Sequence, residues 1–152
     1  MAINIAMLLL GFFGMEAMAH VMHKYVMHGF LWSLHKSHHQ KSKGFFEKND
    51  WYFVIFALPA ILLILQGARM GFNYWFYLGA GIAVYGFTYL VVHDIIIHQR
   101  IRVFTKLSNR YVTALRRAHK AHHADVSKDA AVSYGMLWVH PKYFDTPKSK
   151  AQ

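Results

Sequence analysis

The chain has 152 residues, a length typical of one domain, and 55% of them are hydrophobic whereas only 16% are charged. It contains no cysteine, which excludes disulfides, thiolate zinc sites and cysteine-ligated iron–sulfur clusters. Its formal net charge is +10, a value that alone would not exclude nucleic acid. The segregation of the apolar residues favours a membrane protein over a soluble helical domain. We therefore expect one all-α domain, an integral membrane helical bundle over residues 1–152.

Three apolar stretches approach the roughly 20 residues that cross a bilayer as a helix. The spans are expected at about 3–28, 51–70 and 73–98. A fourth interfacial or re-entrant segment is expected near 103–115, so the bundle has about three to four membrane segments. Trp51 marks one end of the second span, where aromatic side chains commonly meet the headgroups.

The basic residues predict the orientation of these spans. Every lysine and arginine except Arg69 lies within 24–48 or 100–150. An odd number of crossings places both segments on one side, which the positive-inside rule assigns to the cytoplasm. We expect an inner (cytoplasmic) membrane protein with its N-terminus outside and with cytoplasmic segments 29–50 and 99–152. The positive charge then faces anionic membrane lipids, so no nucleic-acid partner is expected.

Ten of the twelve histidines form four boxes of two alternating types, H-x4-H and H-x2-H-H. The boxes are His23 and His28; His35, His38 and His39; His93 and His98; and His119, His122 and His123. Imidazole is a good ligand for iron, zinc and copper, and ten imidazoles suit two metal ions better than one. The topology brings all four boxes to the cytoplasmic surface. The pattern therefore predicts a histidine-rich dimetal cap and a dinuclear metal enzyme.

The spacing within each box suggests how the ligands divide. Residues at i, i+3 and i+4 share a helix face, so each triplet is expected to point together. Residues at i and i+5 diverge by about 140° on an ideal helix, which suits two different metals or a helix end that unwinds. Iron is favoured because two irons can bind and reduce dioxygen. Zinc would imply hydrolysis, for which the sequence offers no nucleophile.

Two carboxylates are candidates for orienting the ligands. Asp94 lies four residues before His98. Glu16 shares a helix face with His20 and His23, so it could either accept a hydrogen bond from a ligand histidine or simply bond to His20. His20 and His140 lie outside the boxes, and we do not include them among the ligands.

Several strings of the sequence resemble the bacterial β-carotene 3-hydroxylases, a family within the fatty acid hydroxylase and sterol desaturase superfamily. They are H-K-Y-V-M-H-G from His23, W-x-L-H-K-S-H-H ending at His39, G-F-F-E-K-N-D-W-Y from Gly44, V-H-D-I-I-I-H-Q-R from Val92, A-H-K-A-H-H from Ala118, and V-S-Y-G from Val132. The resemblance covers nearly the whole chain, and these strings carry it.

The resemblance implies a non-haem di-iron monooxygenase that hydroxylates C3 of the β-ionone rings of β-carotene, giving β-cryptoxanthin and then zeaxanthin. It implies two iron ions held by the ten box histidines, with zinc conceivable in a purified sample. It also implies dioxygen as co-substrate, a carotenoid that enters from the bilayer, and a ferredoxin-type electron donor. The basic side chains of Arg116, Arg117 and Lys120 are candidates for docking that donor.

Three alternatives remain open at this stage. The same site could serve another lipid oxidation, as in a carotenoid ketolase or a fatty acid or sterol hydroxylase or desaturase. A bis-histidine haem electron carrier needs only facing histidine pairs. A divalent metal transporter or chaperone would place its histidines along a pathway within the spans.

Overall fold

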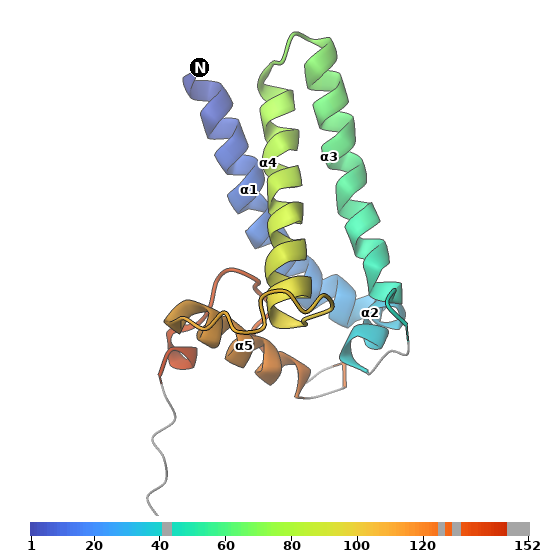
Figure 1. Cartoon of the computed structure of the whole chain (residues 1–152). Helices are drawn as coiled ribbons and strands as arrows, with labels where there is room; N and C mark the ends of the chain where they lie inside the picture. The colour runs from blue at the N-terminus through green and yellow to red at the C-terminus, as the bar shows by residue number, and fades with distance from the viewer. Residues whose placement is uncertain (41–43, 125–126, 129–131, 146–152) are drawn as a thin grey trace, which may run out of the picture.

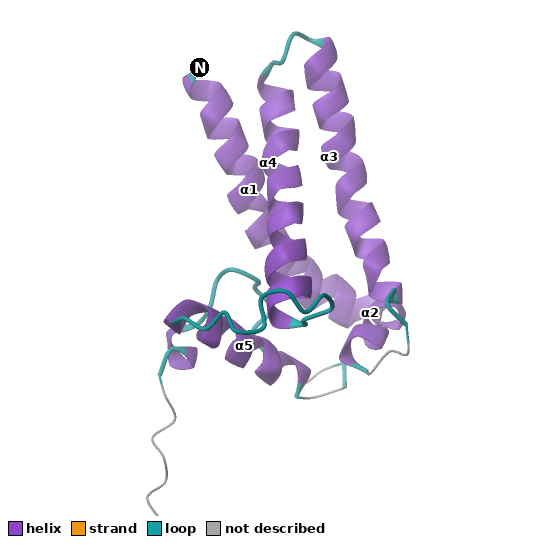
Figure 2. Ribbon diagram, in the orientation of Figure 1, coloured by secondary structure: helices purple, strands orange, loops and turns teal. Residues whose placement is uncertain are grey.

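The computed structural model describes residues 1–40, 44–124, 127–128 and 132–145. Helices are the only regular secondary structure in these ranges, as Figure 2 shows. They are α1 (Ala2–Met22), η1 (His23–Phe30), α2 (Trp32–His39), η2 (Lys48–Asp50), α3 (Trp51–Arg69), α4 (Tyr74–Tyr89), η3 (Leu90–Ile97), α5 (Arg110–His123) and η4 (Pro141–Tyr143). η1 and η3 are π-helical, whereas η2 and η4 are single 3-10 turns.

Three long helical segments of the described chain have the length and composition to cross a membrane: Ala2–Phe30, Lys48–Arg69 and Tyr74–Ile97. They agree closely with the predicted spans. Large apolar side chains on them, such as Leu10, Leu62 and Phe87, are exposed on the isolated chain. Such exposure is unfavourable in water but natural against lipid tails. The chain is therefore a helical membrane protein.

α4 packs against both α1 and α3 and lies between them (Figure 1). Glycines allow this close approach. A Cβ atom at Gly81 would overlap the carbonyl oxygen of Leu8 on α1, and one at Gly79 would lie 2.8 Å from the carbonyl oxygen of Ala60 on α3. Small residues at helix contacts are the usual means of packing within a bilayer, where little hydrophobic driving force remains.

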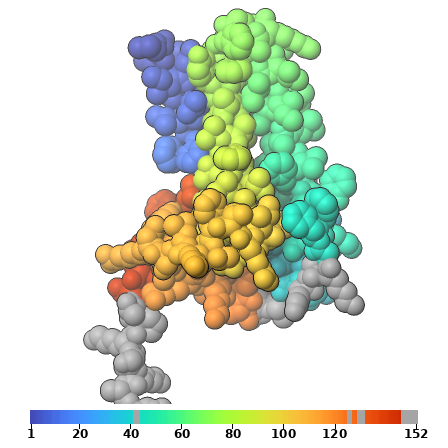
Figure 3. Space-filling view, viewed as in Figure 1, coloured from blue at the N-terminus to red at the C-terminus, as the bar shows by residue number. Residues whose placement is uncertain are grey.

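The remaining elements form a base at one end of the spans (Figures 1 and 3). α5 lies across this end and buries Ala114, Leu115 and Ala118 against Val139. The expected fourth segment near 103–115 is helical only from Arg110 onward. Glu16 of α1 joins the segment after α5 to the spans. Its Oε1 accepts hydrogen bonds from the backbone N–H groups of residues 136–138 at 2.9–3.1 Å.

The π-helical turns lie where two spans enter the base. The backbone N–H of His98 donates to the carbonyl of His93 at 2.9 Å, and that of Leu31 donates to Val26 at 3.0 Å. Both bonds join residue i to residue i+5, which is the π-helical pattern. A turn closed in this way returns residue i+5 to the same side as residue i. It therefore changes where the H-x4-H histidines point.

Candidate metal centre

The ten box histidines converge at one end of the spans, although they are separated by up to 100 residues in sequence. Nine of them form two groups in which the potential ligand atoms lie within 4.8 Å of one another. The first group contains His23, His28, His35, His39 and His122, and the second contains His38, His93, His98 and His119. His123, the tenth, borders the second group, because its ring centroid lies 4.4 Å from that of His119 and 4.8 Å from that of His38.

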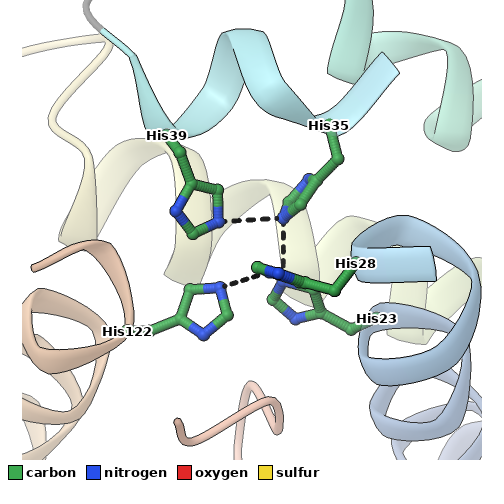
Figure 4. A group of neighbouring side chains, drawn as sticks. All are labelled: His23, His28, His35, His39 and His122. Atoms are coloured by element: carbon green, nitrogen blue, oxygen red, sulfur yellow. Dashed lines mark hydrogen bonds between the residues drawn. The ribbon is translucent and has the colours of Figure 1, made fainter. Parts of the chain in front are cut away.

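Figure 4 shows the first group, in which imidazoles from η1, α2 and α5 point toward a common centre. The Nε2 atoms of His23 and His35 are 3.0 Å apart, those of His39 and His35 3.1 Å, and those of His28 and His122 3.3 Å. Neighbouring nitrogens around one metal ion, each with a bond of about 2.0–2.1 Å, would be separated by about 3.0–3.3 Å. The group therefore has the dimensions of a metal site.

The partners of the opposite ring nitrogens support this interpretation. Three Nδ1 atoms donate to backbone carbonyls: His23 to Tyr134 (3.0 Å), His28 to Lys128 (3.0 Å) and His122 to Val132 (2.9 Å). A carbonyl can only accept, so Nδ1 carries the proton and Nε2 of the neutral ring presents a lone pair. Lone pairs that face one another at these separations repel unless a cation lies between them. The first group thus fits a metal ion.

The second group differs in its hydrogen-bond partners. His38 Nδ1 bonds to Glu47 Oε2 at 3.0 Å, and His93 Nδ1 bonds to Asp94 Oδ1 at 2.7 Å. The Nε2 atoms of His98 and His119 face each other at 2.6 Å. Carboxylate partners make an imidazole more basic than carbonyl partners do. The two candidate sites are therefore chemically unequal, although both are lined by imidazole.

Two imidazole nitrogens at or beside the second group lack a hydrogen-bond partner in the described part of the chain. The Nε2 atoms of His38 and His123 are buried and have no hydrogen-bond partner among the described residues. A buried imidazole nitrogen in that condition is costly unless a ligand satisfies it. Both observations fit a second metal ion with His123 as an additional ligand.

Burial also keeps these histidines neutral. Loss of hydration lowers the pKa of His35, His98 and His122 to about 3 and that of His123 to about 2, with neighbouring imidazoles adding to the effect. The pKa values of His38 and His119 are likewise held well below 6.5 by burial. Since only the neutral ring binds a metal, these groups are ready for metal at pH 7.

The division of ligands differs from the helical prediction. Each H-x2-H-H triplet was expected to point together, but His35 and His39 belong to the first group whereas His38 belongs to the second. His119 and His122 are divided in the same way. Each H-x4-H pair instead stays within one group. The π-helical turn is the physical reason for the pairs, so the unwound helix end is the alternative that holds for them. The triplets lie on the regular helices α2 and α5, and each of them supplies imidazoles to both groups.

Asp94 bonds to a histidine of the second group, His93, and not to His98. Glu16 makes its hydrogen bonds with residues 136–138 and with the hydroxyl of Tyr85, at 2.8 Å. It reaches the first group only indirectly, because the segment that it holds includes Tyr134, whose carbonyl orients His23. His140 lies outside both groups and caps η4 by accepting from the N–H of Lys142 at 3.2 Å.

Four residues that sequence reasoning did not single out have roles at the site. Asn49 Oδ1 accepts from His35 Nδ1 at 2.7 Å, and Glu47 bonds to His38. Asp50 and Arg100 form an ion pair at 2.8 Å beside them. The only signal for them in the sequence is their place in the G-F-F-E-K-N-D-W-Y and H-D-I-I-I-H-Q-R strings. These strings carry the resemblance to the family, but they do not show what each residue contacts.

Two of the three basic residues expected to dock the electron donor, Arg116 and Arg117, instead form hydrogen bonds within the chain. The guanidinium of Arg116 donates to the carbonyls of Ile96 and Leu107, and that of Arg117 donates to the carbonyls of Tyr143 and Asp145. Lys120 lines a recess of about 590 Å³ that opens beside His98 and His123.

A larger cavity of about 790 Å³ lies between the spans. Apolar side chains such as Ile64 of α3 and Ile82 of α4 line most of it. It borders His23 of the first group and His93 and His119 of the second. Its volume is typical of a small-molecule site. One apolar chamber therefore leads from the membrane-spanning region to both candidate metal sites.

These features define a class: a helical membrane protein with two histidine-lined sites that could hold metal ions, beneath an apolar chamber. Comparison with known proteins identifies the family. The model of the fatty acid hydroxylase family matches residues 8–146, so the chain belongs to that family.

Individual relatives are similar over most of the chain. A beta-carotene hydroxylase of Pantoea ananas is 44% identical over 84% of this chain and 73% of its own length. A beta-carotene hydroxylase of Pseudescherichia vulneris is 38% identical over 91% of this chain and 78% of its own length. The chloroplastic beta-carotene 3-hydroxylase of an Oncidium hybrid cultivar is 38% identical over 84% of this chain and 42% of its own length. No solved structure matches the chain.

Proposed function

We propose that the chain is a non-haem di-iron monooxygenase that hydroxylates C3 of the β-ionone rings of β-carotene, giving β-cryptoxanthin and then zeaxanthin. The observation that carries this proposal is the apolar chamber of about 790 Å³ that borders both histidine groups. A carotenoid has no polar group to recognise, so an apolar cavity entered from the bilayer suits it. The names of the relatives point to the same substrate.

The ten box histidines would hold two iron ions, which when bound would supply the reductive cleavage of dioxygen. The balanced reaction converts one C–H bond, one O2, two electrons and two protons into one C–OH and one water. The carbonyls of Val132 and Tyr134 hold the first group's rings in the tautomer that presents Nε2. Glu47 and Asp94 do the same for His38 and His93. The chamber's apolar walls would bind the substrate and exclude bulk water.

The electrons would come from a ferredoxin-type donor at the basic face. Lys120 lies in the recess beside the second group. The reductant would then dock at the recess, and the substrate would occupy the chamber. The same charge distribution supports an inner-membrane location with the N-terminus outside and the histidines and C-terminus in the cytoplasm.

The geometry argues against the alternatives from other classes. A haem bound by two histidines would need the space between their rings. In the first group that space is taken by three other imidazoles, because the ligand atoms of all five histidines lie within 4.8 Å of one another. A transporter would need histidines distributed along the spans, whereas both groups gather at the span ends.

The proposal is tested by expressing the chain in bacteria that accumulate β-carotene and analysing their pigments by chromatography. We expect β-cryptoxanthin and zeaxanthin. His38→Ala should abolish both products without affecting membrane insertion. His140→Ala, which removes a histidine outside both groups, should retain them. Keto-carotenoids as the products, or unchanged β-carotene with correctly inserted protein, would contradict the proposal.

A further inference from the structure

Arg100 joins two parts of the chain that each hold a histidine of the second group. Its guanidinium pairs with both oxygens of Asp50, through Nη1 at 2.8 Å and Nη2 at 2.9 Å. Nη1 also donates to Asp94 Oδ2 at 3.0 Å, and Nη2 donates to the carbonyl of Phe45. One planar side chain therefore contacts four acceptors on three residues, an arrangement for which arginine is suited.

The first of these parts begins at Asp94. Its Oδ1 accepts from His93 Nδ1 at 2.7 Å while its Oδ2 accepts from Arg100. The side chain of Asp94 is 17% exposed and that of Arg100 is 19% exposed, so water screens this interaction only partly. Because Arg100 fixes one carboxylate oxygen, the other is aimed at the ring of His93.

The second part is the short segment that precedes α3. Asp50 Oδ2 accepts from the backbone N–H of Glu47 at 3.0 Å, which completes a capping box around η2. Glu47 in turn bonds to His38 Nδ1 at 3.0 Å. The rings of His38 and His93 stack with centroids 4.9 Å apart. Arg100 thus acts on two neighbouring histidines through two different carboxylates.

The first group is linked to Arg100 less directly. Three of its rings donate to backbone carbonyls, and His35 donates to the amide oxygen of Asn49, which lies in the η2 turn beside Asp50 but makes no bond to Arg100. We therefore propose that Arg100 is a positioning residue chiefly for the second metal site: it orients His38 and His93 by fixing the carboxylates that bond to them. This inference rests on the proposed pair of metal ions.

The test is an anaerobic titration of the full-length, metal-free protein in nanodiscs with Fe²⁺, in competition with a chromophoric chelator. Two single variants show which binding step belongs to which site: His35→Ala should remove the first site, and His38→Ala should remove the second. Wild-type protein should bind two equivalents. Arg100→Gln should weaken the second site about 10-fold to 100-fold, the usual effect of removing a partner of the ligands, and weaken the first site less. The affinity of the second site in Arg100→Lys should lie between those of wild type and Arg100→Gln, since lysine keeps the positive charge but cannot bond to two carboxylate oxygens at once as the guanidinium does.

Arg102→Gln is the matched control, because it removes the same charge from an exposed position in the same segment and should bind as wild type. Wild-type affinity at both sites in Arg100→Gln, or equal loss at both, would overturn the inference. If Arg100→Gln does not yield folded protein, Arg100→Lys decides, and wild-type affinity at its second site is the refuting result. Fewer than two equivalents in wild type would instead refute the metal pair.

Discussion

Replacing Glu16 by alanine should release the segment that follows α5 and thereby weaken the first metal site. The Glu16 carboxylate accepts four hydrogen bonds, from the N–H groups of Met136, Leu137 and Trp138 and from the hydroxyl of Tyr85. Trp138 is 80% exposed, so water can replace the acceptor for its N–H group. Tyr85 is 2% exposed, so water cannot easily do so for the hydroxyl.

Three donors are therefore left without an acceptor in Glu16→Ala. Only the N–H groups of Met136 and Leu137 belong to the segment. Each costs about 1–3 kcal/mol when it stays buried and unsatisfied, so the segment should lose at least about 2 kcal/mol of local stability. A loss of that size raises the open fraction of the segment by more than about 20-fold, since each 1.4 kcal/mol corresponds to a factor of ten. Glu16→Gln keeps an acceptor oxygen, and its amide can donate to Tyr85. It should therefore stay within about 1 kcal/mol of wild type.

Hydrogen exchange in nanodiscs measures this directly at the amides of residues 136–138. Glu16→Ala should lose protection there and bind iron more weakly at the first site, because Val132 and Tyr134 in the same segment orient His122 and His23. Unchanged exchange in Glu16→Ala, or equal loss in Glu16→Gln, would refute the reasoning.

Three further predictions concern the chamber, the helix contacts and pH. A Cβ atom at Gly86, which lines the chamber, would meet nothing within 4 Å. Gly86→Leu should therefore fill part of the chamber and reduce β-carotene hydroxylation about 10-fold or more, with iron content unchanged. Gly14→Leu, at a position that is equally open but outside the chamber, should keep the activity. Gly81→Ala should separate α1 from α4 and cost about 1–3 kcal/mol of stability in thermal unfolding, and a melting curve equal to that of Gly14→Ala would contradict this. The metal-free fold should lose stability as pH falls from about 6.5 toward 3. In that window the histidines of the unfolded chain bind protons, whereas burial holds the pKa of His35, His98 and His122 near 3 in the fold. Denaturant midpoints that stay constant over this pH range would contradict the prediction.

The spans and the convergence of the histidines could be predicted because each follows from a long-range regularity. Apolar stretches near the length of a bilayer crossing identified the segments around α1, α3 and α4. The repeat of the boxes after the first and third spans then placed all ten imidazoles on one side. Neither step needed the conformation of any single turn.

The assignment of the H-x4-H pairs to sites could not be predicted, because it depends on turns that the sequence does not specify. The expected faces assumed 3.6 residues per turn, but His23 and His28 lie in a π-helical turn, and the pair His93 and His98 is joined by an i to i+5 hydrogen bond. The carbonyl partners of the ring nitrogens could not be predicted either, since every residue has a backbone oxygen and the sequence does not show which one a histidine contacts. Arg100 is near its partner Asp94 in sequence but 50 residues from Asp50.

X-ray absorption at the iron edge, combined with iron analysis of the purified wild-type chain, tests the central claim most directly. If the two histidine groups each bind one ion, the protein should hold two irons per chain, both surrounded by imidazole nitrogen and oxygen. A ratio of one, or a spectrum of porphyrin-bound iron, would contradict the paired site from which the hydroxylase activity is argued.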